Sequence, residues 1–169
     1  MENINQIFLI GMMGSGKSTV GVMLAEQLDW TFIDIDKELE KDSGLSVSEM
    51  FKDGESTFRT YEEEKLKEIA SKDHIVCATG GGIVLNEHNY KILDQSFCVY
   101  LDTSLDTLCN RVENDNSRPL LSGGNKKEIM KEIFDTREER YKSLSKLNIT
   151  TDDKSIKDSC KTIMESINE

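Results

Sequence analysis

The sequence predicts an α/β domain of three layers, in which a five-stranded parallel sheet lies between two layers of helices. Short apolar runs typical of buried strands alternate with longer stretches of helical periodicity along the chain. Glycines or carboxylates follow the first three runs, and right-handed crossovers would bring these strand ends to one edge of the sheet. The 169 residues contain no internal repeat or linker, so we expect one domain over residues 1–169.

The first expected strand is the apolar run at residues 7–10. A glycine-rich turn follows it, and a helix begins near Lys17 with Val20, Leu24 and Leu28 on one face. A buried strand that leads directly into a helix is the unit from which parallel sheets are built.

The next segment predicts a short strand and two short helices. Residues 31–36 form a strand that ends in carboxylates, and a helix at 37–43 is closed by Gly44 as its C-cap. The capping-box pattern at residues 46–49 opens a second helix, which stops at Gly54.

The rest of the chain continues the alternation of strands and helices. The expected strands lie at 75–78, 97–101 and 147–150, and the expected helices at 56–71, 86–93, 104–112, 127–144 and along the amphipathic stretch with Ile156, Cys160, Ile163, Met164 and Ile167.

The turn after the first strand fits the phosphate-loop pattern of Gly, four residues, Gly-Lys-Ser/Thr. Glycines allow the backbone to approach a phosphate closely, with the positive end of the following helix dipole behind it. Lys17 can reach the outer phosphates, and the Ser18 hydroxyl can ligate Mg²⁺. A chance match is the alternative, but the strand before and the helix after favour a nucleoside triphosphate site. The loop reads Gly11-Met12-Met13-Gly14-Ser15-Gly16-Lys17-Ser18-Thr19.

The overall composition narrows the class of protein. The net charge of −11 argues against a nucleic-acid partner, and it requires positive charge to be concentrated wherever ATP binds. No apolar run is long enough to span a membrane, and the first strand starts too early to leave room for a targeting peptide, so we expect a cytoplasmic protein. Cys77 and Cys98 fall in strand-like runs and are expected to be reduced core residues, whereas His74 and His88 stand alone.

Two groups of residues are expected at the same edge of the sheet as the loop. Asp34 and Asp36, two apart on a strand end, would point the same way, one toward Mg²⁺ and the other toward a substrate hydroxyl. Alternatively, they simply start the next helix, where acids suit the dipole. The three glycines at 80–82 suggest that a ligand packs against bare backbone, although one glycine in a turn would have an ordinary explanation.

Three arginines have both a functional and an ordinary interpretation. Arg118, in a polar stretch at 113–125, would reach the transferred phosphoryl group if that stretch is a mobile lid, and otherwise it is an exposed loop residue. Arg59 and Arg137 suit a substrate carboxylate, but either can equally be a surface helix residue in an ion pair, as Arg59 with Glu62 would be.

Taken together, these motifs resemble the shikimate kinase family through nearly the whole chain. The landmarks that carry the resemblance are the phosphate loop, Phe32-Ile33-Asp34-Ile35-Asp36, Gly54-Glu55 with Phe58-Arg59, Thr79-Gly80-Gly81-Gly82, Arg118-Pro119-Leu120-Leu121, and Arg137 four residues before Tyr141.

The resemblance implies a P-loop kinase fold and transfer of the ATP γ-phosphoryl group to the 3-hydroxyl of shikimate, in the pathway to chorismate and the aromatic amino acids. It implies a substrate-binding helical segment at about 35–61 and a lid at about 113–125. The implied ATP-binding residues are Gly14, Ser15, Gly16, Lys17, Ser18, Thr19, Arg111 and Arg118, of which Arg111 would stack on adenine. The implied shikimate-binding residues are Asp36, Arg59, Gly80, Gly81, Gly82 and Arg137. The implied catalytic residues are Lys17, Asp36 and Arg118, and Mg²⁺ would be held by Ser18 directly and by Asp34 through water.

The chain departs from the family pattern at two places. Residues 138–140 are Glu-Glu-Arg where the family often has Pro-Leu before Tyr141, and the loop at 151–154 lacks a proline found near adenine in some members. Rival assignments are a gluconate kinase, a nucleoside monophosphate kinase, or a nucleotide-binding regulatory module that does not transfer phosphate. No interaction stripe is left over, so we expect a monomer.

Overall fold

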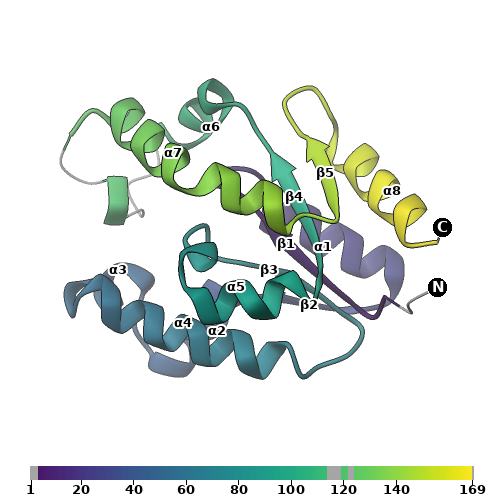
Figure 1. Ribbon diagram of the computed structural model, residues 1–169, viewed down its shortest axis with the longest axis horizontal. Coiled ribbons are helices and arrows are strands. Elements are labelled where there is room, and N and C mark those ends of the chain that lie inside the picture. Colours follow the sequence, from purple (N-terminus) through teal and green to yellow (C-terminus); the bar gives the residue numbers. More distant parts are fainter. Residues whose placement is uncertain (1–3, 114–118, 122–123, 169) are drawn as a thin grey trace.

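The computed structural model describes residues 4–113, 119–121 and 124–168. Its five strands are β1 (Gln6–Ile10), β2 (Thr31–Asp34), β3 (Ile75–Ala78), β4 (Phe97–Asp102) and β5 (Leu147–Thr150). All pairings are parallel, and the strand order is β2-β3-β1-β4-β5 (Figure 1). In the central strand, Phe8 lies opposite Cys77 of β3 on one side and Cys98 of β4 on the other. Both cysteines are buried free thiols, and the predicted parallel sheet is confirmed.

Helices cover both faces of this sheet. They are α1 (Lys17–Leu28), α2 (Ile35–Ser43), α3 (Val47–Lys52), α4 (Glu55–Ile69), α5 (Glu87–Asp94), α6 (Leu105–Val112), α7 (Lys126–Leu144) and α8 (Ile156–Ile167), with 3-10 turns η1 (Ile83–Leu85) and η2 (Pro119–Leu121). Successive side chains of a strand point to opposite faces. Accordingly, Ile7 and Leu9 pack with α1 and α8, whereas Phe8 and Ile10 pack with helices of the other layer, from α4 to α7.

The carboxyl ends of the strands meet at one edge, where the loops after β1 and β3 diverge. The loop after β1 leads to α1 on one face, and the loop after β3 leads to α5 on the other. Parallel sheets bind ligands in the crevice that such divergent loops leave. In Figure 1, α2 and α3 gather at the end of the molecule away from the two termini.

The predicted strand at residues 31–36 is two residues too long. β2 ends at Asp34, and α2 begins at Ile35, so Asp36 lies in the first turn of a helix rather than on a strand. The Asp34 carboxylate accepts a hydrogen bond from the backbone N–H of Lys37 and caps α2, while Ile35 is fully buried. The alternative that these acids start the next helix therefore describes the local structure.

The predicted caps around α2 and α3 are present. Gly44 closes α2 with a left-handed φ of 71°. Ser46 and Glu49 form the reciprocal capping box that opens α3. The chain therefore makes two short helices in close succession, and these form one wall of the site described below.

The predicted lid at 113–125 falls mostly outside the described residues, which omit 114–118 and 122–123. Within it, Pro119 to Leu121 form η2, and the mobile lid stays a prediction.

Among the described helices, none combines the length and the hydropathy that crossing a membrane requires.

Candidate active site

Two cavities adjoin each other at the carboxyl edge of the sheet. The phosphate-loop cavity, of about 490 Å³, lies over the loop after β1, and the arginine cavity, of about 520 Å³, lies between the loop after β3 and helices α2, α3, α4 and α7. The two share part of their lining. The residues common to both are Met13, Ser18, Asp34, Asp36 and Gly81.

The phosphate-loop cavity contains every described residue that the sequence predicted for ATP. These residues are Gly14, Ser15, Gly16, Lys17, Ser18, Thr19 and Arg111. Gly14 and Gly16 have positive φ angles of 81° and 94°, which side chains rarely tolerate. Gly16 also precedes α1 without a side-chain cap, which leaves the first-turn N–H groups of the helix for a ligand such as phosphate.

Lys17 and Arg111 bring positive charge to this cavity. The Lys17 ammonium group donates to the carbonyl oxygens of Gly11 and Met12, both at 2.8 Å, so it is folded back over the loop. Arg111 donates to the carbonyl of Gly14 at 3.1 Å and to that of Thr151 at 3.5 Å. It thereby links the loop to the segment between β5 and α8, whose Lys154 also lines the cavity and was not predicted.

The Ser18 hydroxyl donates to the Asp34 carboxylate at 2.6 Å. Both groups lie on the boundary between the cavities, and both are hard oxygen donors of the kind that Mg²⁺ prefers together with water. The pair therefore fits the ion that the sequence implies, and its role as a metal site remains a prediction.

The arginine cavity contains all the residues that the sequence predicted for the acceptor. They are Asp36, Arg59, Gly80, Gly81, Gly82 and Arg137, and they come from four separate segments of the chain. The structure thus brings these residues together in one cavity, and their roles in binding remain predictions.

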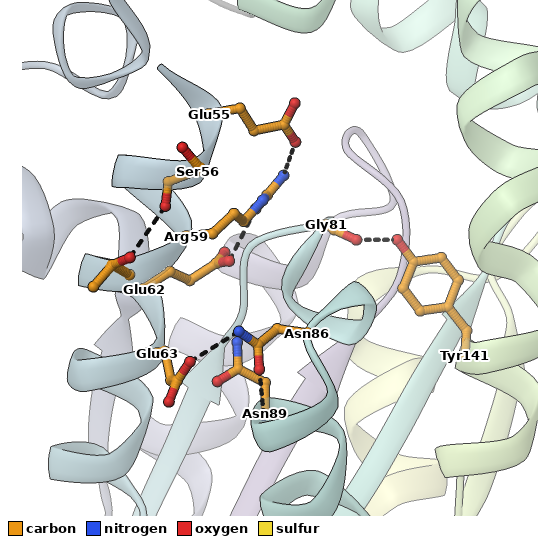
Figure 2. Close-up of polar contacts among 10 residues, drawn as sticks. Glu55, Ser56, Arg59, Glu62, Glu63, Gly81, Asn86, Asn89 and Tyr141 are labelled. Carbon is orange, nitrogen blue, oxygen red and sulfur yellow. Dashed lines mark hydrogen bonds and ion pairs between the residues drawn. The ribbon is translucent and has the colours of Figure 1, made fainter. Parts of the chain in front are cut away.

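Arg59 is held in place from several sides (Figure 2). Its guanidinium group pairs with Glu62 at 2.9 Å and with Glu55 at 3.0 Å, and it lies over the rings of Phe51 and Phe58. The predicted ion pair with Glu62 is present, yet it is no surface feature, because Glu62 is fully buried. Arg59 is therefore both a member of the ion pair and a residue of the cavity, because the pair with Glu62 orients its guanidinium group there.

Sequence reasoning missed Glu62 as a site residue. Burial, opposed by Arg59, raises the pKa of its carboxyl to about 7, and nearby Asp36 adds to the rise. Glu62 lines the arginine cavity, and its Oε1 makes no hydrogen bond within the part of the chain that the structure describes. The one sequence signal for Glu62 was its position one helical turn after Arg59, which indicates an ion pair. Spacing alone, however, does not distinguish a buried ion pair from an exposed one.

Two of the three glycines at 80–82 are explained by neighbouring side chains rather than by a ligand. A Cβ at Gly80 would lie 2.5 Å from Oε1 of Glu62, and a Cβ at Gly82 would overlap the guanidinium group of Arg59. Charged side chains of the site therefore occupy the space that larger residues would fill. Gly81 differs, because a Cβ there would lie 3.4 Å from Nη1 of Arg137 and from the backbone nitrogen of Met13.

Arg118, predicted as the lid arginine, lies outside the described residues. The two residues after it, Pro119 and Leu120, line the arginine cavity. Its predicted contact with the phosphoryl group is therefore open to experiment.

Comparisons with known proteins agree on one family. The family model for shikimate kinase matches residues 13–168. A bifunctional shikimate kinase/3-dehydroquinate synthase of Thermotoga maritima is 44% identical over 144 residues, which are 85% of this chain and only 29% of that protein. A shikimate kinase of Synechococcus elongatus is 41% identical over 136 residues, covering 80% of this chain and 72% of the relative.

A solved structure supports the same assignment. Shikimate kinase from Acinetobacter baumannii in complex with shikimate superposes with a TM-score of 0.95 at 34% identity, covering 99% of this chain and 94% of that one. The P-loop kinase architecture is thus confirmed. The chain belongs to the shikimate kinase family, whose members are ATP-dependent kinases.

Proposed function

We propose that this chain transfers the γ-phosphoryl group of ATP to the 3-hydroxyl of shikimate, giving shikimate 3-phosphate and ADP. The observation that carries the proposal is the shared lining of the two cavities. A phosphoryl donor over the loop and an acceptor beside Arg59 and Arg137 would meet where both cavities are lined by Ser18, Asp34 and Asp36. Family membership supports shikimate as the acceptor.

The arginine cavity suits a small polyhydroxylated acid. Arg59 and Arg137 present two guanidinium groups, which recognise a carboxylate through paired hydrogen bonds. Gly80, Gly81 and Gly82 line the same cavity and offer backbone against which the ring packs. These residues therefore bind and orient the acceptor, so that its 3-hydroxyl faces the phosphate-loop cavity.

The reaction needs a proton acceptor and a charge clamp. Asp36 stands on the shared boundary and takes the proton of the 3-hydroxyl as that oxygen forms its bond to the γ-phosphorus and the bond to the ADP oxygen breaks. Lys17, which is folded back over Gly11 and Met12, swings its ammonium group to the β- and γ-phosphates when ATP binds. Arg118, in the proposed lid, adds a second positive charge beside the transferred phosphoryl group.

Ser18 and Asp34 would hold Mg²⁺, Ser18 directly and Asp34 through water. When bound, this ion would neutralise negative charge on the phosphates during the transfer. The enzyme acts as a cytoplasmic monomer made of one kinase domain, with residues 35–61 as its substrate-binding segment, in the pathway to chorismate and the aromatic amino acids.

The direct test is ADP release in a coupled assay with Mg²⁺-ATP and each of three acceptors: shikimate, gluconate and AMP. We expect saturable ADP release with shikimate alone, accompanied by a shikimate monophosphate detected by mass spectrometry. Turnover with gluconate or AMP instead would reassign the acceptor. ATP binding without any transfer would make the chain a regulatory module, and omission of Mg²⁺ tests the metal.

A further inference from the structure

Tyr141 of α7 contacts two loops of the active site although it lines neither cavity. It is fully buried, and its hydroxyl donates to the backbone carbonyl of Gly81 (Figure 2). The same oxygen lies 3.8 Å from the sulfur of Met12 in the phosphate loop. One phenol thus touches both the loop after β1 and the loop after β3.

The same hydroxyl is also tied to a predicted acceptor arginine. Arg137 precedes Tyr141 by one helical turn, so both side chains lie on one face of α7. Burial raises the pKa of Tyr141 to about 12, while the positive charge of nearby Arg137 opposes this rise. The phenol therefore lies close to the Arg137 guanidinium group, while its proton goes to the Gly81 carbonyl.

Gly81 lies where a small shift of its backbone would affect the binding of both substrates. It lines both cavities, and a Cβ there would lie 3.4 to 3.5 Å from Arg137, Met13 and Gly11. A Cβ there would make only ordinary van der Waals contacts, so crowding does not fix this backbone, and the bond from Tyr141 selects one orientation of its peptide group.

We propose that Tyr141 is a positioning residue of the acceptor site, whose hydroxyl fixes the Gly81 carbonyl and the Arg137 guanidinium in one arrangement that meets the acceptor carboxylate. The inference rests on the proposed acceptor, shikimate. Tyr141 touches no reacting atom and acts through the two groups that it holds. Preorganisation of this kind lowers the cost of ordering the site on binding.

Tyr141→Phe tests the proposal because it removes the hydroxyl and keeps the ring. We expect KM for shikimate to rise about tenfold, the loss of roughly one hydrogen bond to a charged group. KM for ATP should rise less, by at most about twofold, because Lys17 is held by the carbonyls of Gly11 and Met12 and the phenol meets the phosphate loop only at the Met12 sulfur. The matched control is Tyr100→Phe in β4, whose ring stacks on that of Tyr141 with centroids 5.2 Å apart, and which should leave both KM values unchanged.

A second acceptor separates positioning from a general packing effect. The methyl ester of shikimate lacks the carboxylate charge, so its affinity, measured as substrate or as competitor, should differ by less than about twofold between wild type and Tyr141→Phe. Three results would each overturn the proposal. They are equal losses of affinity for shikimate and its methyl ester, an equal rise in KM for shikimate in Tyr100→Phe, and a Tyr141→Phe chain that does not fold. Failure of the proposed function looks different, because the wild type itself would then release no ADP with shikimate.

Discussion

The two cavities of this kinase are nearly equal in size but are built in opposite ways. The phosphate-loop cavity takes about half of its lining from one contiguous stretch, Met13 to Val20, which offers backbone N–H groups and the Lys17 ammonium group. The arginine cavity takes side chains from α2, α4, the glycine triplet and α7, which are up to about a hundred residues apart in the sequence. The donor site is therefore built around a local structure, whereas every wall of the acceptor site depends on the folded chain.

The two cavities also differ in how charge is held. The Lys17 ammonium group is hydrogen-bonded to the uncharged backbone carbonyls of Gly11 and Met12, which a phosphate can replace as its partner. Arg59 is fixed by Glu55 and the fully buried Glu62, so its guanidinium group is oriented before any ligand arrives. This contrast indicates that the donor site adapts to its ligand, while the acceptor site selects its ligand by preformed charge geometry.

The largest expected effect is at the boundary between the cavities. Asp36→Asn removes the proposed proton acceptor without changing the size of the side chain, and we expect kcat to fall by roughly 10²- to 10⁴-fold while the Kd of ATP is kept. Asp42→Asn on the exposed side of the same helix is the control, with unchanged kcat. Near-normal turnover of Asp36→Asn at saturating shikimate would show that this carboxylate is not the proton acceptor.

The next effect should be confined to the arginine cavity. Arg59→Ala removes a charged hydrogen-bonding group, so KM for shikimate should rise roughly 10- to 100-fold while KM for ATP stays unchanged. Arg59→Lys keeps the positive charge but loses the planar, forked guanidinium group, so it should recover only part of the affinity for shikimate. Titration calorimetry with shikimate measures both variants, and an unchanged affinity in Arg59→Ala would remove this residue from the carboxylate site.

Glu62 gives the arginine cavity a pH-dependent contribution to the stability of the fold. Because its pKa is raised from 4.5 to about 7, the folded protein holds a proton that the unfolded chain has lost between these pH values. This contribution to stability is complete below pH 4.5 and disappears as the pH rises through 7. Its size is on the order of 3 kcal/mol at most, from 1.36 kcal/mol for each unit of pKa shift.

Glu62→Gln tests this contribution by urea unfolding between pH 5 and 7.5. The variant cannot titrate, so the free energy of unfolding should fall less steeply with rising pH than in the wild type. Glu63→Gln on the next position of α4 is the matched control, because hydrogen bonds from Lys67, Asn86 and His88 lower the pKa of Glu63 to about 2, outside this window. Parallel pH profiles for wild type and Glu62→Gln would contradict a proton on Glu62.

The same contrast explains what the sequence could predict. The alternating strands and helices of a parallel sheet, the glycine-rich loop after the first strand and the caps at Gly44 and Ser46 follow from local patterns, and all of these were predicted correctly or within two residues. The strand order was not predicted, because it depends on how distant segments pair. The end of β2 was misplaced because an alternating pattern at residues 31–36 fits a strand, while capping by Asp34 favours a helix from Ile35.

The acceptor site depended on the family resemblance rather than on pattern. Nothing local distinguishes Arg59 and Arg137 from surface arginines, because their burial is decided by packing between α4, α7 and the glycine triplet. Glu62 was missed for the same reason. The glycines were correctly placed at the functional edge, but the side chains that require Gly80 and Gly82 become visible only in the structure.

The smallest expected effect lies at the outer wall of the phosphate-loop cavity. Arg111 is exposed and makes two contacts with backbone carbonyls, those of Gly14 and Thr151, so Arg111→Ala should raise KM for ATP only about three- to tenfold. KM for shikimate should not change, because no residue of the arginine cavity contacts Arg111 in the described hydrogen bonds. Initial-rate measurements with each substrate varied in turn decide the matter. If both KM values rose together, the two cavities would be energetically coupled through the loop, and their separate construction would not imply separate function.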